Sequence, residues 1–182
     1  MAHYKELSPL LNGIIGRRFL RNKNLARLLS IYEPNSEKEL PDNLNSLFMT
    51  HIYPMPKMPD AKTDKGAYIC AYFNGGYEIE DNKGYRNVVL NVDIICHIDS
   101  WFYDDSYRVY DIMAEIDSML NNQMTDLPIE GTPYLRGFQT RVYASEFYGV
   151  QMLYNFKMNS TIECNTQPIT EKLRSGMVYD PE

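Results

Sequence analysis

The side chains best suited to chemistry are a few acids, a lysine and a histidine in the middle of the chain. Glu78, Glu80 and Lys83 lie close together between two predicted strands. Acids beside a lysine are the groups with which a nuclease holds a divalent metal. No acid in the neighbouring strand completes such a set at a suitable spacing. A charged, solvated loop explains these residues more simply, so a metal-dependent nuclease is the least favoured function.

A second group lies on one face of a predicted strand. Asp93, His97 and Asp99 share that face, because residues two and four apart in a strand point the same way. The face could bind a metal weakly, but solvent, a neighbouring subunit or a channel explains it without a ligand. Cys96 points to the other face and is predicted to be a small core residue. Ser100 near His97 does not by itself make a triad, so we predict no catalytic residue, metal site or cofactor.

A basic patch lies near the N-terminus of a chain whose net charge is −6. Arg17, Arg18 and Arg21 belong to the first 30 residues, which contain a single acid, Glu6. In a helix Arg17 and Arg21 share a face, so the patch can bind an acidic partner. A solvated helix end is an equally good explanation. The acidic remainder of the chain argues against general binding of nucleic acid.

The composition is that of a globular protein of 182 residues with one core and additional arms. It has three cysteines without Cys-x-x-Cys spacing, no apolar run of the ~20 residues that span a membrane, and no predicted signal peptide. We therefore predict folding in a reducing, intracellular compartment and no membrane partner. The 15 tyrosines favour a protein–protein interface, although half-exposed strand positions are an alternative.

Residues 85–121 organise the predicted fold. Val88, Leu90 and Val92 begin an apolar alternation typical of a half-buried strand. A helix over about residues 104–121 follows, with Asp104 and Ser106 among its candidate N-caps. Its predicted apolar stripe consists of Val109, Ile112, Met113, Ile116 and Leu120.

The flanking segments complete the plan. Two helices are predicted over residues 3–32, the first beginning at Ser8-Pro9 and the second capped by Asn22 or Asn24. A proline-rich arm with Pro54, Pro56 and Pro59 follows. The two β-hairpins then comprise 66–73 with the strand from 85, and 138–147 with 150–158. Turns are predicted at Asn74-Gly75-Gly76 and near Tyr148-Gly149. The fold class is α+β, an antiparallel sheet of two β-hairpins packed on one central helix, with N-terminal helices and extended arms. The segments are 1–65, 66–158 and 159–182.

Two stretches carry a resemblance to a known family. They are VVLNVDIICHIDSWFYDDSYRVYDIMAEIDSMLNN and FQTRVYASEFYGVQMLYNFKM, in which Val92-Asp93-Ile94, Asp104-Asp105, Ile112, Ile116 and Leu120 occupy the corresponding places. Over about residues 66–158 the chain resembles the tail-terminator and neck (head–tail connector) proteins of tailed bacteriophages. The resemblance implies a non-enzymatic homo-oligomeric ring of six or twelve subunits at the neck or tail end of the virion, assembled in the host cytoplasm.

Such a ring would contact other phage neck or tail proteins and let DNA pass through an acidic lumen without specific binding. The candidates to face a neighbouring subunit or the lumen are Asp93, His97, Asp99, Glu78 and Glu80. Arms and sheet edges are predicted to fill gaps between subunits. The alternative is a non-catalytic, dimeric cytoplasmic adaptor that binds another protein through a tyrosine-rich sheet face.

Overall fold

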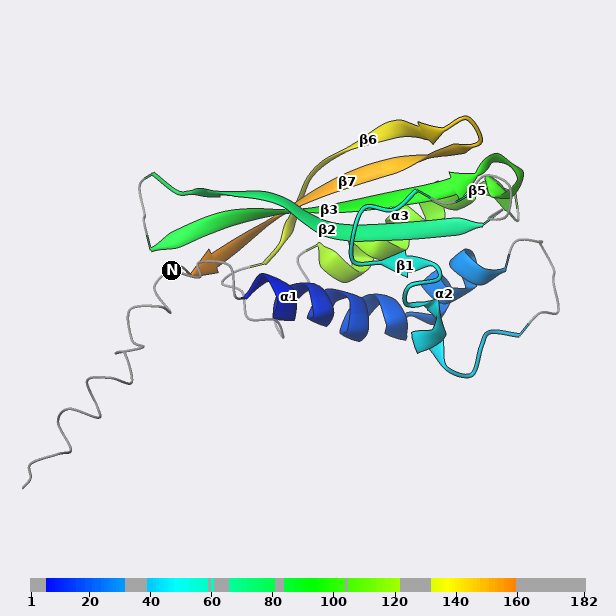
Figure 1. The fold of residues 1–182 in the computed structure, drawn as a ribbon, viewed down its shortest axis with the longest axis horizontal. Coiled ribbons are helices and arrows are strands. Elements are labelled where there is room, and N and C mark those ends of the chain that lie inside the picture. The colour runs from blue at the N-terminus through cyan, green and yellow to red at the C-terminus, as the bar shows by residue number, and fades with distance from the viewer. Residues whose placement is uncertain are drawn as a thin grey trace, which may run out of the picture.

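The α+β class is confirmed in the computed structural model, which describes residues 6–31, 39–58, 60, 66–80, 84–103, 105–121 and 132–159. A five-stranded sheet has the helices against one of its faces (Figure 1). The strands are β1 (Ile52–Tyr53), β2 (Ala67–Glu78), β3 (Tyr85–His97), β6 (Tyr134–Ala144) and β7 (Phe147–Asn159), and β4 (Phe102–Tyr103) with β5 (Ser106–Tyr107) forms a separate two-stranded ribbon. The helices are α1 (Leu7–Gly13), α2 (Lys23–Ser30) and α3 (Arg108–Leu120), with shorter turns η1 (Ile14–Arg18), η2 (Phe19–Arg21), η3 (Leu44–Leu47) and η4 (Ile98–Ser100).

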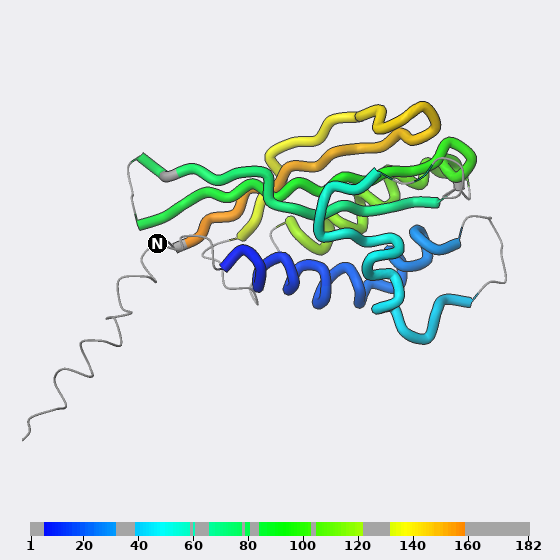
Figure 2. Tube along the Cα trace, viewed as in Figure 1, coloured from blue at the N-terminus to red at the C-terminus, as the bar shows by residue number. Residues whose placement is uncertain are grey.

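The two predicted hairpins form one continuous sheet. The strand order is β1-β2-β3-β7-β6, so β3 is central and its antiparallel pairing with β7 joins the hairpins. That pairing runs from Tyr85 opposite Asn159 to His97 opposite Phe147. β1 pairs in parallel with β2, with Ile52 opposite Ile69. The trace in Figure 2 shows the two hairpins side by side, with the segment containing β1 beside β2.

One core lies between the helices and the sheet. Val88, Leu90 and Val92 of β3 are buried on this side, as the alternation predicts. The predicted stripe of α3 is confirmed at Val109, Ile112, Ile116 and Leu120, each with an exposed fraction of 0%, while Met113 is half-buried. Buried residues of α1, η1 and α2 belong to the same cluster. The N-terminal helices therefore stabilise the sheet by burying apolar area against it.

The N-terminal helices differ in detail from the prediction. α1 begins at Leu7 after the N-cap position Glu6, so the predicted start at Ser8-Pro9 is wrong. Helical backbone continues through Gly13 and Gly16 as a π-helical turn and then a 3₁₀ turn. The cap of α2 is confirmed at Asn22, whose Oδ1 accepts a hydrogen bond from the Leu25 N–H at 2.9 Å.

Both glycine-based turn predictions are wrong. Asn74-Gly75-Gly76 lies inside β2, where a bulge between Phe73 and Gly75 absorbs the irregularity. Gly149 lies inside β7, and the hairpin turns earlier, at 145–146. A Cβ at Gly149 would lie 1.8 Å from the carbonyl oxygen of Ile94, so this glycine permits close approach of β7 to β3.

The segment between β3 and α3 also differs from the prediction. The helix begins at Arg108, and its N-cap residue Tyr107 makes no side-chain capping bond, so the predicted caps are wrong. The short β4–β5 ribbon precedes the helix instead, with Asp105 at its tip in a left-handed conformation (φ 62°). Ser106 donates a hydrogen bond to Asp111 in the first helical turn. Asp104 lies outside the described residues.

The segment that leads into the proline-rich arm pairs with the sheet of the same chain. Its first part is β1, and the Cys70 thiol donates a long hydrogen bond, 3.5 Å, to the carbonyl oxygen of Lys57. Lys57 Nζ in turn donates to the hydroxyl of Tyr53 at 2.8 Å. This part of the arm therefore covers one end of β2 in the same chain. The C-terminal arm was predicted over 159–182, but residue 159 is the end of β7. Pro59 and residues 160–182 lie outside the described residues.

Candidate functional site

The polar face of β3 lies on the side of the sheet opposite the helices, and most of it is buried. Asn91, Asp93 and His97 have exposed fractions of 1%, 5% and 3%. The expectation that Asp93 and His97 face a subunit or lumen is therefore wrong for the folded chain. Asp99, just beyond the strand, is exposed. Alternation predicted the direction of these side chains correctly, but not that neighbouring side chains cover them.

Asp93 is the centre of a hydrogen-bond cluster that joins four strands. Its Oδ2 accepts from the hydroxyl of Tyr72 at 2.8 Å. Its Oδ1 accepts from the hydroxyl of Tyr143 at 2.9 Å and from Nε2 of Gln151 at 2.8 Å. These partners come from β2, β6 and β7, and Gln151 is directly opposite Asp93 in the β3–β7 pairing. A buried carboxylate with three donors is compensated by charge-assisted hydrogen bonds.

The tyrosines of this cluster keep their protons. Burial, followed by the charge and hydrogen bond of Asp93, raises the pKa of Tyr143. Burial is also the largest cause that raises the pKa of Tyr72, with Asp93 adding to it and a hydrogen bond from Asn91 opposing it. Both phenols therefore act as donors, and the oxygens of Asp93 are occupied by donors. The geometry is that of a structural lock between strands rather than of a general base.

Two amide side chains border this cluster. Asn91 Nδ2 donates to the Tyr72 hydroxyl at 3.3 Å, and Asn155 Nδ2 donates to the Tyr134 hydroxyl at 2.8 Å. Within the described part of the chain, the carbonyl oxygens Oδ1 of both Asn91 and Asn155 are buried without a hydrogen-bond partner. Buried sheet positions of this kind are commonly satisfied by ordered water.

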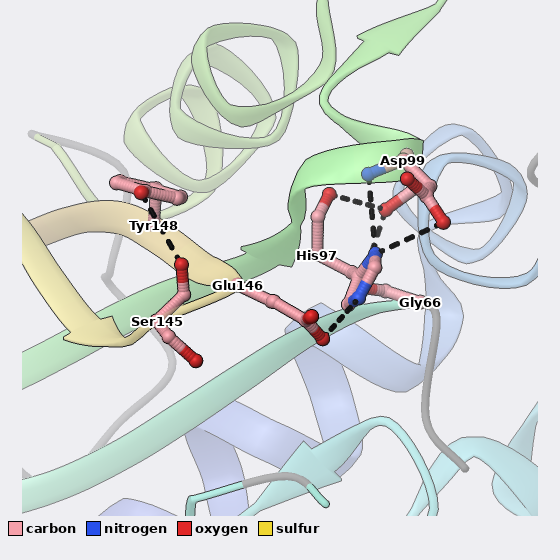
Figure 3. Close-up of polar contacts among 7 residues, drawn as sticks. Gly66, His97, Asp99, Ser145, Glu146 and Tyr148 are labelled. Atoms are coloured by element: carbon pink, nitrogen blue, oxygen red, sulfur yellow. Dashed lines mark hydrogen bonds and ion pairs between the residues drawn. The ribbon is translucent and has the colours of Figure 1, made fainter. Parts of the chain in front are cut away.

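His97 lies between two carboxylates at the other end of β3 (Figure 3). Its Nδ1 accepts from the backbone N–H of Asp99 at 3.1 Å, which leaves the proton of the neutral ring on Nε2. Nε2 lies 3.3 Å from Oε2 of Glu146 in the β6–β7 turn, and the ring packs edge-on against Phe147. His97 therefore fastens η4 to the hairpin turn.

The serine next to His97 does not form a nucleophile–base pair with it. Ser100 Oγ donates to the backbone carbonyl of His97 at 3.1 Å and lies 3.4 Å from the carbonyl of Gly66. These are bonds to main-chain atoms, so the hydroxyl is used in holding η4 against the start of β2. Cys96, predicted to be a core residue, is confirmed as fully buried, and burial raises the pKa of its thiol to about 12.

The other predicted residues are dispersed. Glu78 is the last residue of β2, and the structure describes its backbone only. Glu80 lies just beyond the end of that strand and is exposed. Lys83 lies outside the described residues. Among the residues that are described, no group of three or more His, Cys, Asp and Glu side chains has the arrangement of a metal site.

The basic patch lies on the helical side of the molecule. Arg17 and Arg21 are exposed and Arg18 is half-buried, in the consecutive turns η1 and η2. The patch is thus accessible to a partner at two of its three positions. In the described segments no helix has the length and apolar character needed to cross a membrane.

Arg108 was not among the predicted functional residues, and its exposed fraction is 0%. Its Nε donates to the carbonyl of Ser100 at 2.8 Å, and its Nη1 donates to the carbonyls of Ile31, at 2.7 Å, and Leu28. The guanidinium therefore binds the C-terminal end of α2, where the helix dipole favours a cation. A basic residue at the N-terminal end of α3 is unfavourable for the dipole of that helix. This unfavourable position was the one feature of the sequence that could have indicated a special role for Arg108.

Comparison with known proteins connects this fold to a family. The sequence profile of the YomW family matches residues 22–156, well over half of the chain. The chain belongs to the YomW family. The family has a Bacillus phage-derived name, so the phage part of the resemblance is supported, while the tail-terminator part stays a prediction. A comparison with curated proteins gives no match.

The region that matches the YomW family begins at the cap of α2 and continues into β7. It contains both Arg108 and the Asp93 cluster, so the two buried charged groups belong to the part that defines membership. The basic patch at Arg17, Arg18 and Arg21 lies before the matched region.

Proposed function

We propose that this YomW-family protein is a non-catalytic structural component of a phage virion. In this proposal it forms a hexameric or dodecameric ring at the neck or the end of the tail tube and joins head and tail components. The observation that carries the proposal is membership of a family with a phage-derived name. A sheet whose terminal strand β6 has no further strand beside it in the described residues supports assembly through sheet edges.

The charge of the chain supports passage of DNA without retention. The net charge is −6, and like charges keep a DNA duplex from adhering to a lumen wall. Glu80 and Asp99 are exposed and stay candidates for that wall, as does Glu78. In this proposal the basic patch binds acidic surfaces of other neck or tail proteins through Arg17, Arg18 and Arg21. The proposal includes no cofactor and no membrane partner, and it places assembly in the host cytoplasm.

Oligomeric state tests this proposal. Size-exclusion chromatography with light scattering, followed by negative-stain imaging, is expected to give a ring of six or twelve copies. The measurement is made with and without a purified neck or tail component, because a partner protein can start ring assembly. A protein that stays monomeric in both cases and binds no neck or tail component would contradict the proposal.

One observation favours the alternative of a dimeric adaptor. Phe102, Tyr107 and Tyr110 form an exposed series of edge-to-face aromatic contacts at the β4–β5 ribbon and the start of α3, with centroids 5.7 and 6.2 Å apart. Exposed aromatic groups are typical of protein-binding surfaces. An adaptor would give a defined dimer and no ring, even with phage components present.

A further inference from the structure

The sheet has two long edges on which the described residues place no neighbouring strand. β6 ends the strand order on one side over Tyr134–Ala144. On the other side β1 pairs with β2 only at Ile69 and Cys70. The outer edge of β2 beyond Cys70 therefore has no strand beside it in the described structure. Such edges present unpaired N–H and C=O groups that can pair with another chain.

The directions of these two edges are complementary. β2–β3, β3–β7 and β7–β6 are each antiparallel, so β6 runs opposite to β2. A second copy in the same orientation would place its β2 antiparallel to β6 of the first copy. Because the two edges lie on opposite sides of the sheet, this contact leaves one edge of each copy available for the next. A heterologous contact of this kind repeats and can close into a ring.

Charge distinguishes this arrangement from pairing of β6 with itself. β6 carries the exposed bases Arg136 and Arg141 and no acid. The uncovered part of β2 and the residues just after it carry Glu78 and Glu80 and no base. Opposite charges across neighbouring strands stabilise a pairing, whereas a two-fold β6–β6 contact would bring four arginines together.

Exposed apolar groups lie beside the same edges. Phe138 and Val142 of β6 have exposed fractions of 54% and 69%, although they point to the face that the helices cover elsewhere, opposite Met152 and Tyr148. Tyr77 of β2 is 48% exposed. A neighbouring strand would remove apolar area of these side chains from water.

We propose that β6 of one copy pairs antiparallel with the uncovered part of β2 in the next copy of this chain. This inference rests on the ring of the proposed function and adds which edges meet. Bulges between Leu135 and Gly137 and between Val142 and Ala144, together with the two arginines, limit pairing of β6 with other edges. The partner edge is therefore selected by its acids.

Charge reversal tests the pairing in the full chain. Reversing β6 (Arg136→Glu with Arg141→Glu) or β2 (Glu78→Lys with Glu80→Lys) is expected to raise the concentration for half-assembly about tenfold. Combining all four changes restores complementarity between identical copies and is expected to restore assembly. Lys23→Glu with Arg27→Glu, on exposed positions of α2, is the matched control for the β6 reversal, because it lowers the net charge by the same amount. It is expected to leave assembly unchanged.

Cross-linking tests the identity of the edges directly. Gln139→Cys and Tyr77→Cys lie on the same face of the sheet, away from the helices. They are made separately with Cys164→Ser, and a short bismaleimide is added to each chain and to their mixture. Cys70 and Cys96 are buried, so they contribute little background. The proposal expects a dimeric product in the mixture and little in either chain alone. A product from the Gln139→Cys chain alone would indicate a two-fold β6 contact and overturn the proposal.

The remaining outcomes separate this inference from the ring itself. Rings that form normally, with no cross-link in the mixture and no effect of charge reversal, would overturn the β6–β2 pairing and leave the ring intact. A further variant carries Gln139→Cys and keeps the native Cys164. If these two cysteines link within one chain, the C-terminal segment occupies the edge and the pairing is wrong. A wild-type chain that never oligomerises would remove both the ring and the pairing.

Discussion

Two charged side chains are buried on opposite sides of the sheet, and the protein satisfies them in different ways. Arg108, in the helical layer, donates to backbone carbonyls of η4 and of the end of α2. Asp93, on the opposite face, accepts from the side chains of Tyr72, Tyr143 and Gln151. The first charge joins η4 to the C-terminal end of α2, and the second joins four strands of the sheet.

This difference determines what each group contributes. The carbonyls around Arg108 cannot be changed by substitution, so removing the guanidinium leaves them buried without that donor. The donors around Asp93 are side chains, of which Tyr72 and Tyr143 are only half-buried and can turn toward water. Loss of Arg108 should therefore cost more than loss of the charge on Asp93. Neither group is available for chemistry, because each is occupied by partners within the chain.

Arg108→Met breaks the helical side of the comparison and is expected to have the largest effect. Methionine replaces much of the apolar volume but none of the donors, so the free energy of unfolding should fall by about 3–5 kcal/mol. Urea unfolding followed by circular dichroism measures this. Arg27→Met on the exposed face of α2 is the matched control and should change stability little. A loss for Arg108→Met as small as that of the control would contradict the assigned role.

Asp93→Asn breaks the sheet side and should cost less, about 2 kcal/mol. The amide keeps one acceptor oxygen but replaces the other with a donor, which meets the donors already present, and the charge-assisted bonds are lost. The same urea measurement applies, with Asp42→Asn on an exposed position as control. If Asp93→Asn were neutral while Arg108→Met was severe, the cluster would be incidental to stability rather than a lock.

The comparison also shows what sequence could and could not predict. The period of β3 and α3 predicted the apolar face, the helix and the class of the fold, because alternation and helical spacing reflect burial directly. Burial of Asp93 could not be predicted, since it depends on a β3–β7 register that places Gln151 opposite it. Gly149 was predicted to belong to a turn, because glycine is typical of turns. Its actual role, the close approach to Ile94, exists only once β7 has paired with β3. Arg108 was missed because its partners are main-chain atoms, which any sequence provides.

Tyr143→Phe removes a single donor from the Asp93 side and is the finest of these tests. At neutral pH the loss of one hydrogen bond to a charged group should cost about 1.5 kcal/mol. Tyr110→Phe, at a position 46% exposed, is the control.

The pH dependence of this variant separates the hydrogen bond from packing. Burial and Asp93 raise the pKa of Tyr143 above the ordinary value of 10.0, so the folded protein keeps a proton that the unfolded chain releases. The stabilising contribution is therefore complete below pH 10 and is lost progressively as the pH rises above it. Tyr143→Phe should weaken the decline in unfolding free energy between pH 9 and 11, while Tyr72, Tyr154 and Cys96, whose pKa values burial also raises, maintain part of it. Equal declines in the variant and the wild type would mean that the Tyr143 hydroxyl ionises in the folded state as it does in water. That result would contradict its role as a buried donor to Asp93.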